Sequence, residues 1–173
     1  YFTASDSVAY YNTAAASEEW LVFLKTGTPF IHFLAWPFVS VLGLSYYGVM
    51  LVFSYFGYLA VMYFYITARE NVKLKVIWQN LSATELVFLL PNLHFWSSSL
   101  GKGSVILFGL SMFTFGLSRF NRRLLPIFFG SVLVFFVRPH IFFTLVAAVM
   151  IGVLITRTGI KGYLKWLIFL LSL

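Results

Sequence analysis

The feature that most constrains this chain is a stretch without a charged residue, residues 26–68, between Lys25 and Arg69. As an α-helix this stretch would extend roughly 64 Å, whereas the hydrocarbon core of a bilayer is about 30 Å thick. A soluble fold cannot hide so long an uncharged segment, because ordinary domains carry charge over their whole surface. We therefore predict an integral membrane protein that passes through the bilayer more than once.

Composition and pattern favour helices as the membrane segments. Of the 173 residues, 61% are hydrophobic and 10% are charged. Segments such as GVMLVFSYFGYLAVMYFYI (48–66) and FFTLVAAVMIGVLI (142–155) are apolar on every face, whereas membrane strands alternate apolar and polar residues. Helices also satisfy their own backbone hydrogen bonds in lipid. The predicted fold class is an all-α, polytopic transmembrane bundle.

The chain divides into two predicted parts. Residues 1–28 form an outer polar loop with an amphipathic helix, and residues 29–173 form a transmembrane domain of about five to seven segments. Several uncharged runs in the second half would extend only about 21–24 Å as helix, so short or re-entrant helices are expected. Because the chain starts at Tyr1 and ends in the apolar run KWLIFLLSL, we expect a fragment whose last segment is incomplete.

The basic residues predict the orientation of the chain. Most Lys and Arg side chains fall in three loops, at 69–75, 119–123 and 157–165. Two predicted crossings separate each loop from the next, and the positive-inside rule places all three in the cytoplasm. Lys102 and Arg138 then face the outer side, where topology does not call for a cation.

The side of residues 1–28 depends on how residues 29–44 meet the membrane. If residues 29–44 cross it fully, the N-terminal loop is cytoplasmic. If they form a re-entrant or interfacial piece, broken at Pro37, the loop lies outside with Lys102 and Arg138. We favour the second arrangement, because the loop has one Lys against three acids.

The segment FFVRPHIFF places Arg138 and His140 between two apolar runs. Pro139 prevents a helix from continuing through them, and a helix restarting there offers free N–H groups. A guanidinium group binds phosphate in bidentate fashion. These features predict an anion site, although a snorkelling arginine and an interfacial histidine at a tight turn would give the same pattern.

A second candidate is PNLHFWSSSLGKG, residues 91–103. Lys102 would add a cation, its flanking glycines allow close backbone approach, and Ser98 can hydrogen-bond an oxyanion or a sugar. His94 and Trp96 could stack on a sugar ring. The alternative is a lone lysine in a Gly-rich turn, with Trp96 in an interfacial belt.

An isolated carboxylate, Asp6, lies in ASDSVAYYNTA. It suits a general base or a metal ligand, or it caps a helix over residues 8–20. His32 is an ionisable group in an apolar run, hence a functional candidate or a neutral histidine bonded to a neighbouring helix. Scattered histidines and the absence of cysteine make zinc improbable. The net charge of +7 lies at helix ends and does not indicate nucleic acid.

Three motifs together resemble a known group of proteins. They are D-S-x-x-Y from Asp6 to Tyr10, P-x-L-H-F-W-S-S-x-L-G-K from Pro91 to Lys102, and R-P-H-I from Arg138. They are similar to motifs of multi-pass proteins of Bacteroidota-type bacteria that look like GT-C glycosyltransferases and polysaccharide polymerases, and the resemblance covers most of the chain. It implies a polyprenyl-phosphate-linked sugar handled at the outer face of the bacterial cytoplasmic (inner) membrane.

By this resemblance Asp6 would be a base or metal ligand, and Lys102, Arg138 and His140 would bind the donor phosphate. GT-C enzymes often show paired acids, whereas Asp6 stands alone, so a metal-independent base or an arginine-centred polymerase fits as well as a metal site. No cofactor is expected, although a divalent metal is compatible. Two other classes remain open: a non-catalytic subunit of a larger membrane assembly, and a transporter or lipid-handling protein, for which short helices and His32 are also typical.

Overall fold

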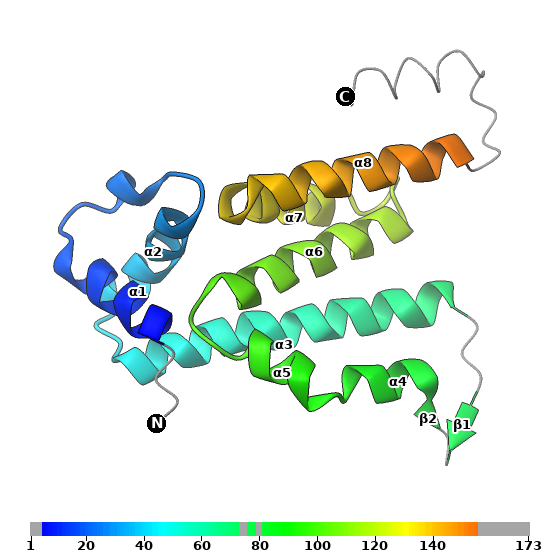
Figure 1. Ribbon diagram of the computed structural model, residues 1–173, viewed down its shortest axis with the longest axis horizontal. Helices are drawn as coiled ribbons and strands as arrows, with labels where there is room; N and C mark the ends of the chain where they lie inside the picture. The colour runs from blue at the N-terminus through cyan, green and yellow to red at the C-terminus, as the bar shows by residue number, and fades with distance from the viewer. Residues whose placement is uncertain (1–4, 73–75, 79–80, 156–173) are drawn as a thin grey trace.

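Eight α-helices make up the part of the chain that the computed structural model describes, namely residues 5–72, 76–78 and 81–155 (Figure 1). The helices are α1 (Ser5–Ala16), α2 (Thr28–Trp36), α3 (Tyr46–Asn71), α4 (Ala83–Phe88), α5 (Pro91–Ser97), α6 (Lys102–Ser118), α7 (Leu124–Val137) and α8 (Pro139–Ile155). The predicted all-α class is confirmed. Predictions about Lys73, Lys75, the basic loop 157–165 and the last apolar run lie outside the described residues.

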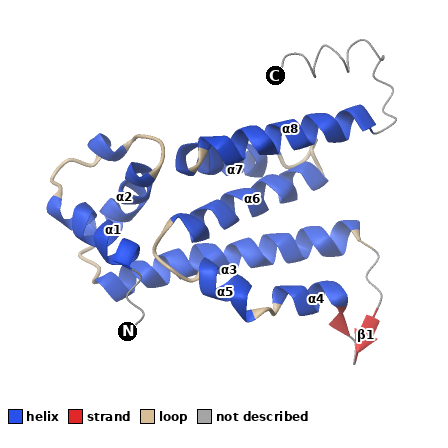
Figure 2. Ribbon diagram, in the orientation of Figure 1, coloured by secondary structure: helices blue, strands red, loops and turns tan. Residues whose placement is uncertain are grey.

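Three short elements complete the described fold. A 3-10 turn, η1 (Leu21–Phe23), precedes α2, and a π-helical turn, η2 (Pro37–Val41), follows it. A small antiparallel pair, β1 (Val76–Trp78) and β2 (Leu81–Ser82), joins α3 to α4 (Figure 2). The two strands are too short to alter the fold class.

Local sequence signals set several helix starts. Proline lies in the first turn of α2, α5 and α8, where its missing N–H leaves no bond unmade. Ser45 caps α3 by accepting a hydrogen bond from the Gly48 N–H at 3.4 Å. The predicted helix restart at Pro139 is confirmed. The apolar stretch after Ser82, in contrast, is divided into α4 and α5, because Pro91 removes a donor and restricts the residue before it.

Helices α3, α6, α7 and α8 run along the long axis of the molecule (Figure 1), and α6 makes its most extensive contacts with α7 and α3. Glycine lets α6 and α7 approach closely. A Cβ atom added at Gly130 would lie 2.6 Å from the Gly109 carbonyl oxygen and 2.7 Å from the Phe113 nitrogen. One added at Gly116 would overlap Ile127. The α6–α7 seam therefore depends on the absence of side chains at these positions.

Helices α4 and α5 follow the side of α3. The Tyr65 hydroxyl donates to Glu85 Oε1 at 3.1 Å, and the Ser54 hydroxyl contacts the Ser98 carbonyl oxygen at 2.8 Å. A Cβ atom added at Gly57 would overlap the Ser97 carbonyl oxygen and lie 2.7 Å from its carbon. The contacts of Ser54 and Gly57 fix where the turn that follows α5, and hence the start of α6, lies against α3.

Helices α1 and α2 pack across one end of this bundle (Figure 1). The Gly27 N–H donates to the Phe136 carbonyl oxygen at 2.7 Å, and the ring of Phe30 stacks on that of Phe136, with centroids 4.9 Å apart. One apolar core cluster includes residues from five helices, among them Ala14, Ile31, Phe53, Val105 and Val137. Residues 5–28 thus share a core with the bundle, and a domain division at residue 28 stays a prediction.

Charged side chains lie at the opposite end of the bundle. Arg123 donates to both carboxylate oxygens of Glu70, each at 2.8 Å, and its guanidinium carbon lies 3.8 Å from the centroid of the Phe115 ring. Arg119 Nε approaches the same carboxylate at 3.4 Å. Since Glu70 is near the end of α3 and both arginines follow α6, these ion pairs join α3 to the α6–α7 turn.

Replacing Glu70 with glutamine should lower the thermal unfolding midpoint of the detergent-solubilised protein, because a neutral amide cannot balance Arg119 and Arg123. The midpoint can be followed by intrinsic fluorescence. Glu18→Gln removes the same formal negative charge, but at an exposed position, and should leave the midpoint unchanged. Equal midpoints for the two variants would show that the ion pairs do not stabilise the fold.

One helix in the described part, α3 with 26 residues, is long and apolar enough to cross a membrane. A second span results if α5 and α6, which are bent by 108° at the break between them, are counted as one. Residues 28–41, 124–137 and 139–153 form shorter apolar helices. The structure thus supports one or two candidate spans by length and composition.

Candidate functional site

The two cations singled out in the sequence lie at helix ends. Lys102 is the first residue of α6 and is half-buried. Arg138 follows α7, is exposed, and its carbonyl oxygen accepts hydrogen bonds from the N–H groups of Ile141 and Phe142 in the first turn of α8. His140 is exposed in that same turn. The starts of α6 and α8 thus each carry a basic residue beside N–H groups that point out of the helix.

Tyr10 of α1 lies between the groups that the sequence analysis named. A Cβ atom added at Gly101, next to Lys102, would lie 3.7 Å from Tyr10 Cε2. Burial raises the pKa of Tyr10 above its usual value, the Asp6 carboxylate raises this pKa further, and Arg138 opposes the increase. The charges of Asp6 and Arg138 thus act in opposite directions on the same group, the Tyr10 hydroxyl.

His32 of α2 joins Tyr10 to Lys102. Its Nδ1 lies 3.3 Å from the Tyr10 carbonyl oxygen, and the two rings meet edge to face with centroids 5.5 Å apart. Burial lowers the pKa of His32 most, the hydrogen bond to Tyr10 raises it, and the positive charge of Lys102 lowers it. Tyr10 and His32 are in contact, and the charges of Asp6, Arg138 and Lys102 act on one or the other of them. We call these five residues the Tyr10 cluster.

Contacts with α3 hold α1 in place over this end of the bundle. The Ser7 Oγ and the Tyr46 hydroxyl oxygen are 2.8 Å apart, and the Tyr11 hydroxyl donates to the Leu44 carbonyl oxygen at 3.1 Å. Asp6 is exposed in the first turn of α1, where its charge interacts favourably with the helix N-terminus. Because α1 already begins at Ser5, Asp6 lies within the helix and is not its N-cap, so the capping predicted as an alternative is wrong.

The other predicted site residues lie along α5. His94 Nε2 contacts the Phe88 carbonyl oxygen at 2.7 Å, and the Ser98 hydroxyl donates to the Phe95 carbonyl oxygen at 3.3 Å. Trp96 is 66% exposed. These contacts stabilise the α4–α5 segment, and the structure does not bring His94, Trp96 or Ser98 into contact with the Tyr10 cluster through them.

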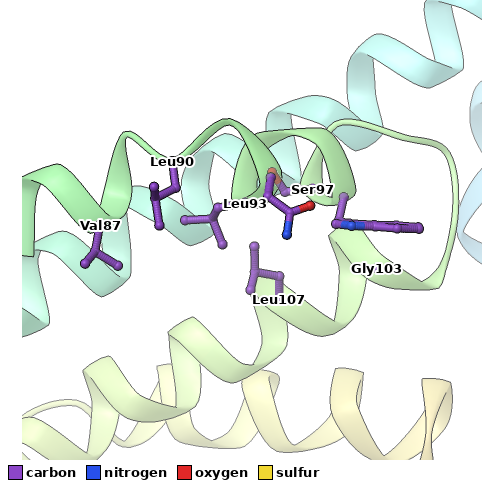
Figure 3. A pocket seen from close by; sticks show the side chains of 8 residues that line it. Val87, Leu90, Leu93, Ser97, Gly103 and Leu107 are labelled. Atoms are coloured by element: carbon purple, nitrogen blue, oxygen red, sulfur yellow. The ribbon is translucent and has the colours of Figure 1, made fainter.

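Trp96 instead lines an apolar groove of about 340 Å³ between the α4–α5 segment and α6. In Figure 3 the side chains of Val87, Leu90 and Leu93 point toward Leu107 of α6 across this groove. Gly103, the residue after Lys102, lies at its margin. The groove could hold an apolar chain, and its polar end is near one cation of the cluster.

Tyr10 is the residue of the cluster to which the sequence assigned no role. It belongs to the D-S-x-x-Y motif, but tyrosine is common in this chain, so its position is informative only once α1 is placed against α2 and α6. Within the described residues no group of three His, Asp or Glu side chains could hold a metal ion.

The fold and the Tyr10 cluster together define the class of this protein: an all-α helical chain with one or two candidate membrane spans and a polar cluster at one end of its bundle. The chain matches no protein-family model, and no curated protein or solved structure matches it significantly. The Tyr10 cluster is therefore the feature that bears most directly on its function.

Proposed function

We propose that this chain is a multi-pass protein of the bacterial cytoplasmic membrane that transfers or polymerises sugars from a polyprenyl-phosphate-linked donor at the outer face. The observation that carries the proposal is the Tyr10 cluster. It combines the carboxylate of Asp6 with the cations of Lys102 and Arg138, which are distant in sequence, at one end of the helix bundle. The motif resemblance described above supports the same function.

The charge distribution supports an outer location for the cluster. The end of the bundle away from α1 carries Arg69, Arg119, Arg122 and Arg123, which the positive-inside rule assigns to the cytoplasm. The Tyr10 cluster, at the other end, then faces outward. Since α1 lies at that end too, the arrangement favours the prediction that the N-terminal segment is outside.

Helix α2 with η2 fits an interfacial or re-entrant segment better than a crossing. Residues 28–41 extend only about 21 Å as helix, which is shorter than the hydrocarbon core. The turn before α2 exposes Leu21 (72%), Val22 (49%) and Leu24 (47%), apolar side chains of the kind that enter the membrane interface. We accordingly assign α3, the α4–α5 segment, α6, α7 and α8 to the membrane.

The proposed reaction needs positive charge at a phosphate and a base at a hydroxyl. As the bond from the anomeric carbon to phosphate breaks, negative charge develops on the departing lipid phosphate, and Lys102 and Arg138 would stabilise it. The N-terminus of α6 adds N–H donors, since no side chain caps it. The acceptor hydroxyl loses its proton to a base, the role that the resemblance implies for Asp6.

The proposal is tested in the native host by the variants Asp6→Asn, Lys102→Ala and Arg138→Ala. Each should reduce long-chain surface glycan by about 100-fold or more, because removing one group that stabilises a transition-state charge costs about that much in rate. Tyr65→Phe, at a hydrogen bond to α4 away from the cluster, is the control. Glycan of normal length in all three variants, with normal amounts of protein in the membrane, would refute the proposed function.

One observation favours the second candidate, a subunit of a larger membrane assembly. Tyr47, Leu51, Tyr55 and Tyr58 are all more than half exposed, and their spacing places them on one face of α3. Hydroxyl groups facing hydrocarbon are unfavourable, whereas a neighbouring protein can bond to them. If photo-crosslinking from position 58 in native membranes captured a second protein and the cluster variants left glycans unchanged, the subunit function would be preferred.

A further inference from the structure

We infer that His32, and not Asp6, accepts the proton of the acceptor hydroxyl in the Tyr10 cluster, with Nε2 as the reacting atom. This inference rests on the proposed function and changes the residue that carries one step of it. The hydroxyl oxygen forms a bond to the anomeric carbon, the bond from that carbon to phosphate breaks, and its electron pair leaves on the phosphate. The hydroxyl proton passes to Nε2 and then to water.

The hydrogen bond of His32 fixes which nitrogen is free. A carbonyl oxygen can only accept, so Nδ1, which lies 3.3 Å from the Tyr10 carbonyl oxygen, carries the proton. In the neutral imidazole Nε2 then holds a lone pair. When one ring nitrogen of a histidine donates to a backbone carbonyl oxygen, this hydrogen bond sets the tautomer and orients the other nitrogen for proton transfer.

His32 is 9% exposed, and none of its contacts includes a hydrogen bond at Nε2. Among the described residues no fully enclosed side-chain nitrogen or oxygen lacks a hydrogen-bond partner, so Nε2 is not fully enclosed. The acceptor hydroxyl would approach Nε2 from this open side of the ring.

The surroundings keep this imidazole neutral. Burial and the charge of Lys102 lower the pKa of His32 below its usual value of about 6.5, which outweighs the hydrogen bond to Tyr10. The elements around it present the Tyr10 ring from α1, the Phe23 ring from η1 and Lys102 from α6. A neutral histidine with a free lone pair can act as a base at neutral pH.

Asp6 has a different place in the cluster. It is exposed in the first turn of α1, where its charge raises the pKa of Tyr10 while that of Arg138 opposes the increase. A carboxylate in this position balances part of the positive charge of Lys102 and Arg138. Its loss should weaken substrate binding, whereas loss of the His32 base should stop the transfer.

The first test compares His32→Asn and His32→Gln in the native host. The Asn amide can still donate to the Tyr10 carbonyl oxygen, and the Gln amide reaches the position of Nε2, but neither can accept a proton. Both variants should lower long-chain glycan by about 100-fold or more, the contribution expected of a general base. Tyr65→Phe again serves as the control, and membrane levels of every variant are measured by immunoblot.

The results separate the inference from the proposed function. If Lys102→Ala and Arg138→Ala shorten the glycan but His32→Asn accumulates normally and makes glycan of full length, the function stands and the inference fails. If all of these variants make normal glycan, both fail. Loss of glycan in His32→Asn and His32→Gln at normal protein levels supports the inference.

A second test uses the unmodified protein and so does not depend on whether a variant folds. Diethyl pyrocarbonate acylates neutral, accessible imidazole, and peptide mass spectrometry reports the modification of each histidine in the detergent-solubilised protein. His32 should react at pH 7, and inorganic pyrophosphate, the probe for the phosphate site, should slow its modification severalfold. A His32 that stays unmodified while the exposed His140 reacts would overturn the inference.

Discussion

Replacing Gly57 with valine should prevent the chain from reaching its folded state. Gly57 lies on the buried face of α3, and any Cβ atom there would overlap the Ser97 carbonyl oxygen and lie 2.8 Å from Ser97 Cβ. These are atoms of the backbone and its first side-chain carbon, which cannot rotate away, so the cost should exceed the roughly 1–3 kcal/mol typical of overpacking. The measurement is the yield and elution profile of detergent-extracted protein in size-exclusion chromatography.

Gly152→Val is the matched control for this change. Gly152 is an exposed glycine in α8, and a Cβ atom there would meet nothing within 4 Å. This variant should elute as the unmodified protein does. A monodisperse Gly57→Val protein with unchanged thermal stability would mean that α5 does not pack on α3 at Ser97. The position described for the turn from α5 to Lys102 would then be wrong.

Replacing Gly130 with alanine should destabilise the α6–α7 seam by about 1–3 kcal/mol or more. The added carbon would lie 2.6 Å from the Gly109 carbonyl oxygen and 2.7 Å from the Phe113 nitrogen, both backbone atoms of α6, so α7 must move outward. Because Arg138 ends α7, the movement should also separate its guanidinium from Tyr10. We expect a lower thermal unfolding midpoint together with shorter surface glycan in the native host.

For Gly130 the matched control is Gly152→Ala, the same chemical change in a helix with open space around it. Alanine favours a helix over glycine by about 1 kcal/mol, so this variant should be unchanged or slightly more stable. If Gly130→Ala were as stable as Gly152→Ala, the added carbon would meet no obstacle, and the close contact of α6 with α7 would be wrong.

A local signal in the sequence predicted one helix start correctly. Pro139 begins α8, because its ring sets its own backbone geometry and prevents α7 from continuing. The helix expected over residues 8–20 ends earlier, at Ala16. Contacts with α2 account for this: the Trp36 indole N–H donates to the Ser17 carbonyl oxygen, and the Trp20 indole N–H donates to that of Phe33, each at 2.9 Å.

The partners within the Tyr10 cluster could not be predicted, because they depend on how distant segments pack. The sequence identified Asp6, Lys102 and Arg138 separately by their charge in apolar surroundings, and His32 as an ionisable group in an apolar run. That Tyr10 lies against His32 follows only from the packing of α1 on α2. Glu70 is a similar case: it binds Arg123 in bidentate fashion from 53 positions away, a pairing that follows only from the packing of α3 beside the α6–α7 turn.

The long sequence separation within the Tyr10 cluster has a consequence for how the protein is made. Asp6 is synthesised before α3, α6 and α7, whereas Arg138 emerges only after these three helices have been translated. Helix α1 is therefore made long before the turn between α7 and α8 that completes the cluster. A chain interrupted before Arg138 would carry α1 to α7 but could not assemble the cluster, so formation of the site depends on synthesis of the α7–α8 turn.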